Sequence, residues 1–310
     1  MKRLSTLILA LLFSTQTLAA DKLELLLDWF INPDHGPIIV AQQQGYFAKQ
    51  GLEVSMVEPA DPSMPPKLVA AGKADMAIGY QPQLHQQIGE GLPLLRVGTL
   101  VATPLNSLVV LEEGPVKSIA DLKGRKVGYS VSGFEDALLR AMLEKHGLSL
   151  DDIELVNINW SLSPSLISGQ VDAVIGAFRN FELNQMEIEK HPGRAFYVEE
   201  EGVPAYDELI LVINSKNRDD DRMPRFLAAI EQATQYIVNH PDAAWESFVG
   251  YKPDALNTEL NKRAWADTLT RFALRPAALD QQRYRRFGEF MLKQGLIKHN
   301  PPVDSYAIQP

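Results

Sequence analysis

Cysteine is absent from this chain of 310 residues. Its absence excludes disulfides, thiolate metal sites and a cysteine nucleophile, so stability must come from buried apolar cores. An excess of positive charge is also absent, because 39 acidic residues outnumber 30 basic ones. Nucleic-acid-binding proteins normally show the opposite balance, and we therefore expect no nucleic-acid partner.

Common catalytic and cofactor motifs are missing as well. The sequence contains no Walker loop, no Gly-x-Gly-x-x-Gly, no Gly-x-Ser-x-Gly and no His-Glu-x-x-His. The six histidines are scattered without metal-ligand spacing. We therefore expect neither a bound metal nor a cofactor.

Long hydrophobic runs are missing outside the N-terminus, where the first twenty residues have the features of a secretion signal. Lys2 and Arg3 precede a short apolar run at residues 7–13, and small residues follow up to Ala19 and Ala20. The run is too short to span a bilayer, and its order is typical of a cleaved signal peptide; an ordinary core segment is the alternative. Because no cysteine follows, a lipid anchor is excluded, and we expect a free periplasmic protein.

Apolar runs typical of strands alternate with helical patterns along the chain, and the same order occurs twice. This alternation indicates an α/β fold with mainly parallel sheets. The first series comprises residues 23–27, 35–50, 52–57, 67–71 and 76–79, and the second comprises residues 126–130, 135–146, 153–158, 165–168 and 173–176.

A short repeat links the two series. GKADMAIG at residues 72–79 matches GQVDAVIG at residues 169–176, and the flanking residues 52–54 resemble residues 153–155. In each octet the first Gly suits a left-handed helix C-cap, and a buried strand is expected after the Asp. A glycine and an aspartate between a helix and a strand are common in α/β proteins, but the matching flanks favour two related lobes.

The repeat predicts a hinged clamp of two α/β lobes that closes on a ligand. We expect the first lobe to span residues 21–106 and the second to span residues 107–206. Residues 207–310 then return to the first lobe, with the helical stretch 223–295 packing on it. Ligands of such sheets bind beyond the carboxyl ends of the strands.

Residues 27–37, LDWFINPDHGP, carry a more specific pattern, which GYF follows at residues 45–47. The spacing Trp-x-x-Asn-x-x-His in this segment closely resembles the opening of the family of thiamine-pyrimidine precursor binding proteins and pyrimidine synthases. Residues 72–79, 121–129 and 239–245 resemble later signatures of the family, although the Leu-Lys-Gly-x-x-Val-Gly piece is shared with nitrate, taurine and alkanesulfonate binders. The resemblance covers nearly all of the mature chain and implies a periplasmic-binding-protein-like fold of type II.

The family has an enzymatic branch and a transport branch. The synthases carry a lysine directly after the Asp-Met-x-x strand and a cysteine-rich run, whereas this chain has Gly79 at the first position and no cysteine. The resemblance therefore implies the transport branch, whose members bind formylated aminopyrimidines for an ABC importer. The expected partners are an aminopyrimidine and a membrane permease. The chain is expected to be a monomer, and it is not expected to be an enzyme.

Candidate ligand residues in the first lobe follow its predicted strands. Trp29 lies just past the first strand, where an indole can stack on a flat heteroaromatic ring, although a core position is the alternative. Asn32 and His35 can donate and accept toward ring nitrogens, although His35 equally suits a cap or a core. Tyr80 and Gln81 follow the strand of the first octet and are also expected in the cleft.

Three candidates in the second lobe precede a predicted helix. Ser130, Ser132 and Gly133 are expected to present hydroxyl groups and free backbone amides to the ligand, although Ser132 also suits a plain N-cap. Trp160, after the second strand of this lobe, is a further stacking candidate.

Phe178 and Glu182 follow the strand of the second octet, so the repeat predicts that they face Tyr80 and Gln81 across the cleft. A carboxylate at Glu182 can accept from an exocyclic amino group; the alternative is an exposed Glu on a helix face. Arg179 is the only basic residue in the predicted cleft segments. A neutral or weakly cationic aromatic ligand therefore fits better than a sulfonate or nitrate, but oxyanion binding and synthase activity remain alternatives.

Overall fold

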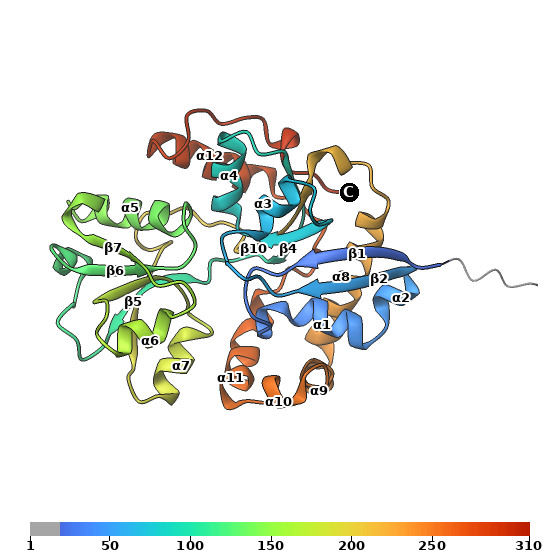
Figure 1. The fold of residues 1–310 in the computed structure, drawn as a ribbon, viewed down its shortest axis with the longest axis horizontal. Coiled ribbons are helices and arrows are strands. Elements are labelled where there is room, and N and C mark those ends of the chain that lie inside the picture. The colour runs from blue at the N-terminus through green and yellow to red at the C-terminus, as the bar shows by residue number, and fades with distance from the viewer. Residues whose placement is uncertain (1–18) are drawn as a thin grey trace, which may run out of the picture.

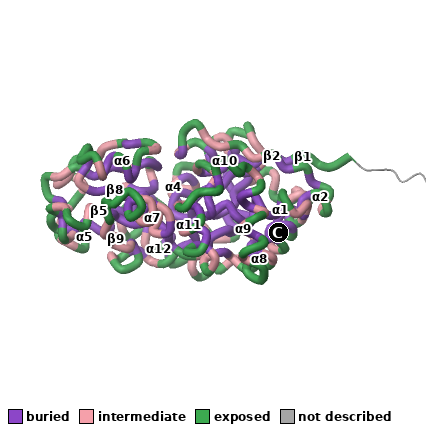
Figure 2. The backbone as a smooth tube through the Cα atoms, turned by 90° about the horizontal axis from the view of Figure 1, so that it is seen from below, coloured by how far each residue is buried: buried purple, intermediate pink, exposed green. Residues whose placement is uncertain are grey.

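The computed structural model describes residues 19–310, so the predicted signal sequence lies almost entirely outside the described residues. The chain forms two lobes, each built on a five-stranded sheet with helices on its faces (Figure 1). In both lobes the central strands of the sheet are buried, and exposed segments lie toward the periphery (Figure 2). None of the helices in residues 19–310 combines the length and apolarity needed to cross a membrane.

The two sheets have equivalent strand orders, β2-β1-β3-β10-β4 and β7-β6-β8-β5-β9. Four strands of each sheet run in the same direction, and the fourth strand in the order runs antiparallel to both of its neighbours. The first sheet contains β1 (Asp21–Leu26), β2 (Leu52–Val57), β3 (Met76–Gly79), β4 (Leu94–Val101) and β10 (Leu209–Asn214). The second contains β5 (Asn106–Leu111), β6 (Lys126–Tyr129), β7 (Glu154–Asn157), β8 (Ala173–Phe178) and β9 (Gly193–Tyr197).

The helices divide between the lobes according to the sheet that they cover. The first lobe carries α1 (Gly36–Gln43), α2 (Tyr46–Lys49), α3 (Pro65–Ala70) and α4 (Gln81–Gly89). The second lobe carries α5 (Glu135–Lys145), α6 (Leu162–Ile167) and α7 (Glu182–Ile188). The C-terminal helices are α8 (Arg222–Asn239), α9 (Pro241–Val249), α10 (Pro253–Leu256), α11 (Glu259–Thr268) and α12 (Gln281–Lys293). Of these, α8 packs on α1 and α2, α12 packs on α4, and α11 also contacts α7 of the second lobe.

The octet repeat performs the same structural task in both lobes. Gly72 and Gly169 have φ angles of +69° and +73°, so each ends its helix in the left-handed conformation that glycine adopts without strain. Asp75 then accepts a hydrogen bond from the backbone N–H of Glu24 at 2.9 Å, and Asp172 accepts one from Lys126 at 3.0 Å. In each lobe the octet Asp therefore ties its own strand to the neighbouring parallel strand.

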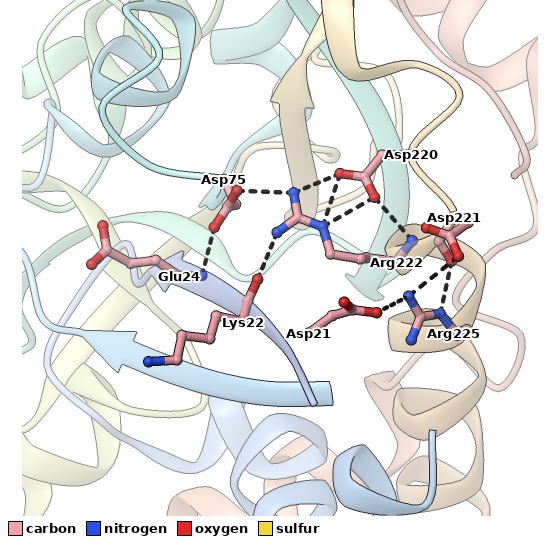
Figure 3. Close-up of polar contacts among 8 residues, drawn as sticks. All are labelled: Asp21, Lys22, Glu24, Asp75, Asp220, Asp221, Arg222 and Arg225. Atoms are coloured by element: carbon pink, nitrogen blue, oxygen red, sulfur yellow. Dashed lines mark hydrogen bonds and ion pairs between the residues drawn. The ribbon is translucent and has the colours of Figure 1, made fainter. Parts of the chain in front are cut away.

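The first lobe adds an ionic layer at this point. Arg222, from the start of α8, donates to Asp75 at 3.0 Å and to Asp220 at 2.6 Å, and it also donates to the carbonyl of Lys22 (Figure 3). Arg225, one turn later, pairs with Asp21 at 2.6 Å. These contacts attach the returning C-terminal helix to the first sheet.

Two crossover segments join the lobes, between β4 and β5 and between β9 and β10. The buried carboxylate of Glu208, from the second crossover, accepts from the backbone N–H of Leu105 in the first crossover at 2.5 Å and from that of Asn106, the first residue of β5, at 2.9 Å. It also accepts from the hydroxyl of Tyr206 at 3.0 Å. Glu208 thus holds the two crossovers together.

Candidate functional site

A cavity of about 440 Å³, including space open to solvent, lies between the two lobes. The first lobe lines it with residues that follow β1 and β3, and the second lobe with residues on or after β6 and β8 and on α6 and α7. Its lining consists of Asp28, Trp29, Asn32, Asp34, Tyr80, Val131, Glu135, Leu162, Gly176, Phe178, Phe181 and Glu182. The cavity therefore lies at the carboxyl ends of the strands, where α/β sheets bind ligands.

The lining combines aromatic rings with acidic groups. Asp28 and Asp34 from the first lobe face Glu135 and Glu182 from the second, and neither Lys nor Arg is among the described residues of the lining. Apolar walls with a few convergent polar groups are typical of small-molecule sites. This combination favours ligands that present hydrogen-bond donors over ligands that present negative charge.

The Trp-x-x-Asn-x-x-His segment forms a capped turn, which explains the spacing of Asn32 and His35. Asn32 is the N-cap of a short 3-10 helix, η1 (Pro33–His35), and its side chain accepts from the backbone N–H of Asp34 at 2.8 Å. Nδ1 of His35 accepts from the backbone N–H of Asn32 at 3.2 Å. Since Nδ1 is the acceptor, Nε2 carries the proton and donates to Asp28 at 2.9 Å.

This arrangement fixes Asp28 in the wall of the cavity. Its second carboxylate oxygen accepts from the hydroxyl of Tyr80 at 2.9 Å. Burial and the neighbouring charge of Asp28 raise the pKa of Tyr80, so the hydroxyl stays protonated and acts as the donor. The family pattern thus serves to orient Asp28, with His35 wholly buried behind it.

Asp34 lies in the same turn and bridges the lobes. Its Oδ1 accepts from the side-chain amide of Asn180, in the second lobe, at 2.7 Å, and it lies 3.1 Å from the hydroxyl of Thr268 on α11. Burial raises the pKa of Asp34 to about 6, although these hydrogen bonds favour the charged form.

The two acids of the second lobe are held by backbone groups. Glu135 accepts from the N–H of Ser130 at 2.6 Å, and Glu182 accepts from the N–H of Phe178 at 2.6 Å. Burial raises the pKa of each to about 8, partly offset by these hydrogen bonds. Both carboxyls are therefore largely protonated at neutral pH.

Aromatic contacts cross the cleft beside the cavity. The rings of Trp29 and Trp160 meet edge to face with centroids 4.4 Å apart, and Tyr80 stacks on Phe134 at 4.6 Å. Phe178 meets the Tyr80 ring edge-on at 6.4 Å. Aromatic rings from both lobes therefore lie at or beside the cavity.

Five of the residues predicted from sequence line the cavity: Trp29, Asn32, Tyr80, Phe178 and Glu182. His35 is not in its lining, and both of its ring nitrogens are engaged by protein groups. Gln81 is also buried elsewhere, where its side-chain oxygen accepts from the backbone N–H of Asp207 at 2.8 Å.

The remaining predicted residues lie beside the cavity. Ser130 donates its hydroxyl to the carbonyl of Asn159, and its backbone supports Glu135. Ser132 is exposed, and Gly133 adopts a φ of +81° in the same loop. Trp160 contacts Trp29 from outside the lining.

Sequence reasoning missed three of the four cavity acids. Asp28 and Asp34 lie inside the segment that carries the family resemblance. Their proximity to Trp29 in the sequence could have identified them as cavity residues. Glu135 begins α5, and an acid in the first turn of a helix is too common to mark a site.

Arg179, the one basic residue of the predicted cleft segments, points to another partner. Its guanidinium makes a bidentate pair with Glu199, at 2.6 and 2.8 Å, and lies over the ring of Tyr197. The oxyanion alternative loses its expected cationic group, because Arg179 is already neutralised and does not line the cavity.

Relatives share most of the chain. A Haemophilus influenzae protein named for thiamine biosynthesis is 58% identical over 302 residues, covering 97% of this chain and 96% of that protein. The formylaminopyrimidine-binding protein of Halalkalibacterium halodurans is 33% identical over 252 residues, covering 78% and 76%. A 4-amino-5-hydroxymethyl-2-methylpyrimidine phosphate synthase of Saccharomyces cerevisiae is 28% identical over 271 residues, covering 80% and 76%.

A solved structure agrees with the fold. The alkanesulfonate-binding protein SsuA from Xanthomonas axonopodis pv. citri, bound to MOPS, superposes with a TM-score of 0.73 over 93% of this chain and 99% of that one, at 16% identity. The predicted two-lobed, periplasmic-binding-protein-like α/β fold is thereby confirmed. The family described as NMT1/THI5 like matches residues 32–244. The resemblance seen in the sequence is therefore confirmed, and the chain belongs to the NMT1/THI5-like family.

Proposed function

We propose that this chain is the solute-binding component of an ABC importer and that it captures a formylaminopyrimidine or a close relative in the cavity between its lobes. The observation that carries this proposal is the composition of the cavity, which joins aromatic rings to four carboxyl groups, with no basic side chain among the residues of 19–310 that line it. The relative named as a formylaminopyrimidine-binding protein supports the same ligand class.

An aminopyrimidine matches these groups in detail. Its flat ring can stack on Trp29, and its exocyclic amino group can donate to Glu182. A protonated carboxyl at Glu182 can also donate its own hydrogen to a ring nitrogen, which gives two parallel hydrogen bonds. The raised pKa of Glu182 supports this pairing, because the carboxyl keeps at neutral pH the proton that it would donate.

The oxyanion alternative has less support from the cavity. A sulfonate or nitrate would face four carboxyl groups, and anion sites normally supply cationic side chains or helix N-termini. The likeness to SsuA concerns the fold, at 16% identity.

The synthase alternative lacks the lysine that the synthases carry. Gly79 stands where the synthases carry lysine, and a Cβ at this position would lie 3.1 Å from Cγ of Pro66 and 3.2 Å from Oε1 of Gln83. No described lysine lines the cavity, and the chain has no cysteine. We therefore propose a binding protein rather than an enzyme.

Export to the periplasm and release to a permease complete the proposal. N-terminal sequencing of the protein from a periplasmic fraction is expected to begin after Ala19 or Ala20. Intact Met1 in cytoplasmic material would count against export.

Calorimetric titration tests the ligand class. The wild-type protein is expected to bind formylaminopyrimidine and to give no binding heat with taurine or nitrate. Binding of the anions without binding of the pyrimidine would overturn the proposed function.

A further inference from the structure

We infer that contacts between α7 of the second lobe and α11 of the first form a clasp, which holds the lobes together and limits the rate at which a ligand leaves. The clasp pairs residues 180, 184 and 187 with residues 268, 267 and 263, in that order. None of these six residues is among the described residues that line the cavity. The effect of the clasp on the ligand rests on the proposed function, whereas its effect on the lobes does not.

The spacing of the three contacts follows from two helices that pack side by side. Residues 180, 184 and 187 are spaced at i, i+4 and i+7, which places them along one side of α7 and of the turn before it. Their partners run in the opposite direction along α11, from residue 268 back to residue 263. The two helices contact each other along the lower edge of the lobes in Figure 1. The clasp is therefore a row of contacts that closure makes together.

The innermost contact of the clasp is buried. Nδ2 of Asn180 donates to Oγ1 of Thr268 at 2.7 Å, and the two residues are 1% and 0% exposed. The Thr268 hydroxyl donates to the carbonyl of Ala264 at 2.7 Å, which orients its oxygen to accept from Asn180. A hydrogen bond shielded from water is stronger than the same bond at the surface. Opening of the lobes would break it, because its donor and its acceptor belong to different lobes.

The middle contact has a donor that is held in place by its own lobe. Nδ2 of Asn184 donates to Oδ2 of Asp267 at 2.8 Å and also to the carbonyl of Asn180 at 2.9 Å. The second of these bonds lies within the second lobe, so it can orient the amide before the lobes meet. Hydrogen bonds to a carboxylate are roughly twice as strong as those between neutral groups. Neither Asn184 nor Asp267 lines the cavity, so this contact can be removed without changing the ligand site.

The outermost contact is an exposed ion pair. Arg263 lies 3.5 Å from Glu187, with side chains 39% and 67% exposed, and it also pairs with Glu259 of its own helix at 2.8 Å. Exposed ion pairs contribute little to stability and are screened by salt. The strength of the clasp therefore comes mainly from its two inner contacts.

Each helix of the clasp is anchored in the core of its own lobe. Trp265 of α11 is buried, and its ring lies 5.3 Å from Phe248 and 5.8 Å from Trp245 on α9. Met186 of α7 is wholly buried in an apolar cluster of the second lobe. The helices therefore move with their lobes, and the cleft cannot open unless the clasp breaks.

The test compares release rates of formylaminopyrimidine in stopped-flow measurements. Asp267→Ala removes the acceptor of the middle contact from an exposed position, so release is expected to become about three- to thirtyfold faster, while association is not slowed. Asp267→Asn keeps an oxygen that can accept from Asn184 and is expected to restore most of the wild-type rate. Asp254→Ala, on an exposed acid of α10 outside the clasp, is the matched control and is expected to leave the rate unchanged.

A double-mutant cycle tests whether the two residues of the middle contact act as a pair. Asn184→Ala is expected to speed release about as much as Asp267→Ala, and the double variant is expected to release the ligand no faster than either single variant. Multiplied effects in the double variant would show that the two residues act independently, which would contradict the clasp.

A distance measurement tests the clasp without a ligand. Because the chain contains no cysteine, spin labels can be attached to introduced cysteines alone, at Glu189→Cys in the second lobe and Lys262→Cys on α11, both at exposed positions. In the ligand-free protein, addition of Asp267→Ala is expected to shift the distribution of label distances to longer values.

An unchanged release rate for Asp267→Ala, or an equal increase for Asp254→Ala, would overturn the inference while the proposed function stands. If the wild type binds no pyrimidine, the proposed function fails, and the label distances then decide the inference alone. Coinciding distance distributions with and without Asp267→Ala would in that case overturn it.

Discussion

The two lobes share a sheet order and an octet repeat, but they hold their cavity acids in different ways. In the first lobe, Asp28 and Asp34 are fixed by side chains, including one that comes from the other lobe. In the second lobe, Glu135 and Glu182 are fixed by backbone N–H groups of their own loops. The acids of the second lobe are therefore preformed by local backbone geometry, whereas Asp34 depends on closure.

This difference also appears in the last glycine of the octet. Gly176 has a φ of +102°, and a side chain there would collide with the carboxylate of Glu135. Gly79, its counterpart, has no such φ and meets Pro66 and Gln83 less closely. The second lobe thus uses the glycine to make room for a cavity acid, and the first lobe does not.

The largest expected effect concerns ligand affinity. Glu182→Ala removes the carboxyl proposed to pair with the ligand and leaves polar groups of the ligand unpaired at a cost of roughly 1–3 kcal/mol, so affinity for formylaminopyrimidine should fall about ten- to a hundredfold in calorimetry. Glu189→Ala, on an exposed residue just past the end of the same helix, should leave affinity unchanged. If binding persists and Glu182→Ala has no effect, the family assignment stands and the role given to Glu182 is wrong.

The two equivalent glycines, Gly176 and Gly79, allow the lobes to be compared through the free energy of unfolding. Gly176→Ala should lower the free energy of unfolding by about 1–3 kcal/mol, because it adds both backbone strain and a clash with Glu135. Gly79→Ala should cost about 1 kcal/mol or less, since only contacts near 3.1 Å must adjust. Urea unfolding of both variants measures the difference, and a larger loss for Gly79→Ala would contradict the contrast between the lobes.

A further expected effect is a pH dependence of the free energy of unfolding. Burial raises the pKa of Glu135 from 4.5 to about 8, so the folded chain holds a proton that the unfolded chain releases between these values. This contribution to stability is present below pH 4.5 and is lost as the pH rises through 8. Glu135→Gln does not titrate, so its stability relative to wild type should rise by about 1–3 kcal/mol between pH 5 and pH 8.5.

Glu144→Gln, on an exposed residue of the same helix, is the control for this measurement and should follow the wild-type profile. A Glu135→Gln profile parallel to wild type across the same range would show that Glu135 carries no raised pKa.

The fold was predictable because it rests on local patterns. The octets at residues 72–79 and 169–176 revealed both helix ends and both buried strands, since glycine and strand hydrophobicity act within a few residues. Trp29, Tyr80 and Phe178 followed from the rule that strand ends carry ligand residues.

The rest of the site depends on contacts between distant segments. The role of Asp34 requires Asn180, 146 residues away, and Thr268, 234 residues away, and no spacing in the sequence connects them. His35 was predicted to face the ligand, but its partners are the backbone of Asn32 and the side chain of Asp28. A polar side chain near a strand end can bind other protein groups or face the cavity, and the packing of the folded chain determines which of the two occurs.

The most direct test of the central claim, that the acidic aromatic cavity holds an aminopyrimidine, is mass spectrometry of the ligand retained when the protein is purified from its native host. We predict that denaturation releases a compound with the mass and fragmentation pattern of a formylaminopyrimidine or a close relative with a primary ring amine. Release of an alkanesulfonate or another oxyanion in stoichiometric amount would contradict the claim.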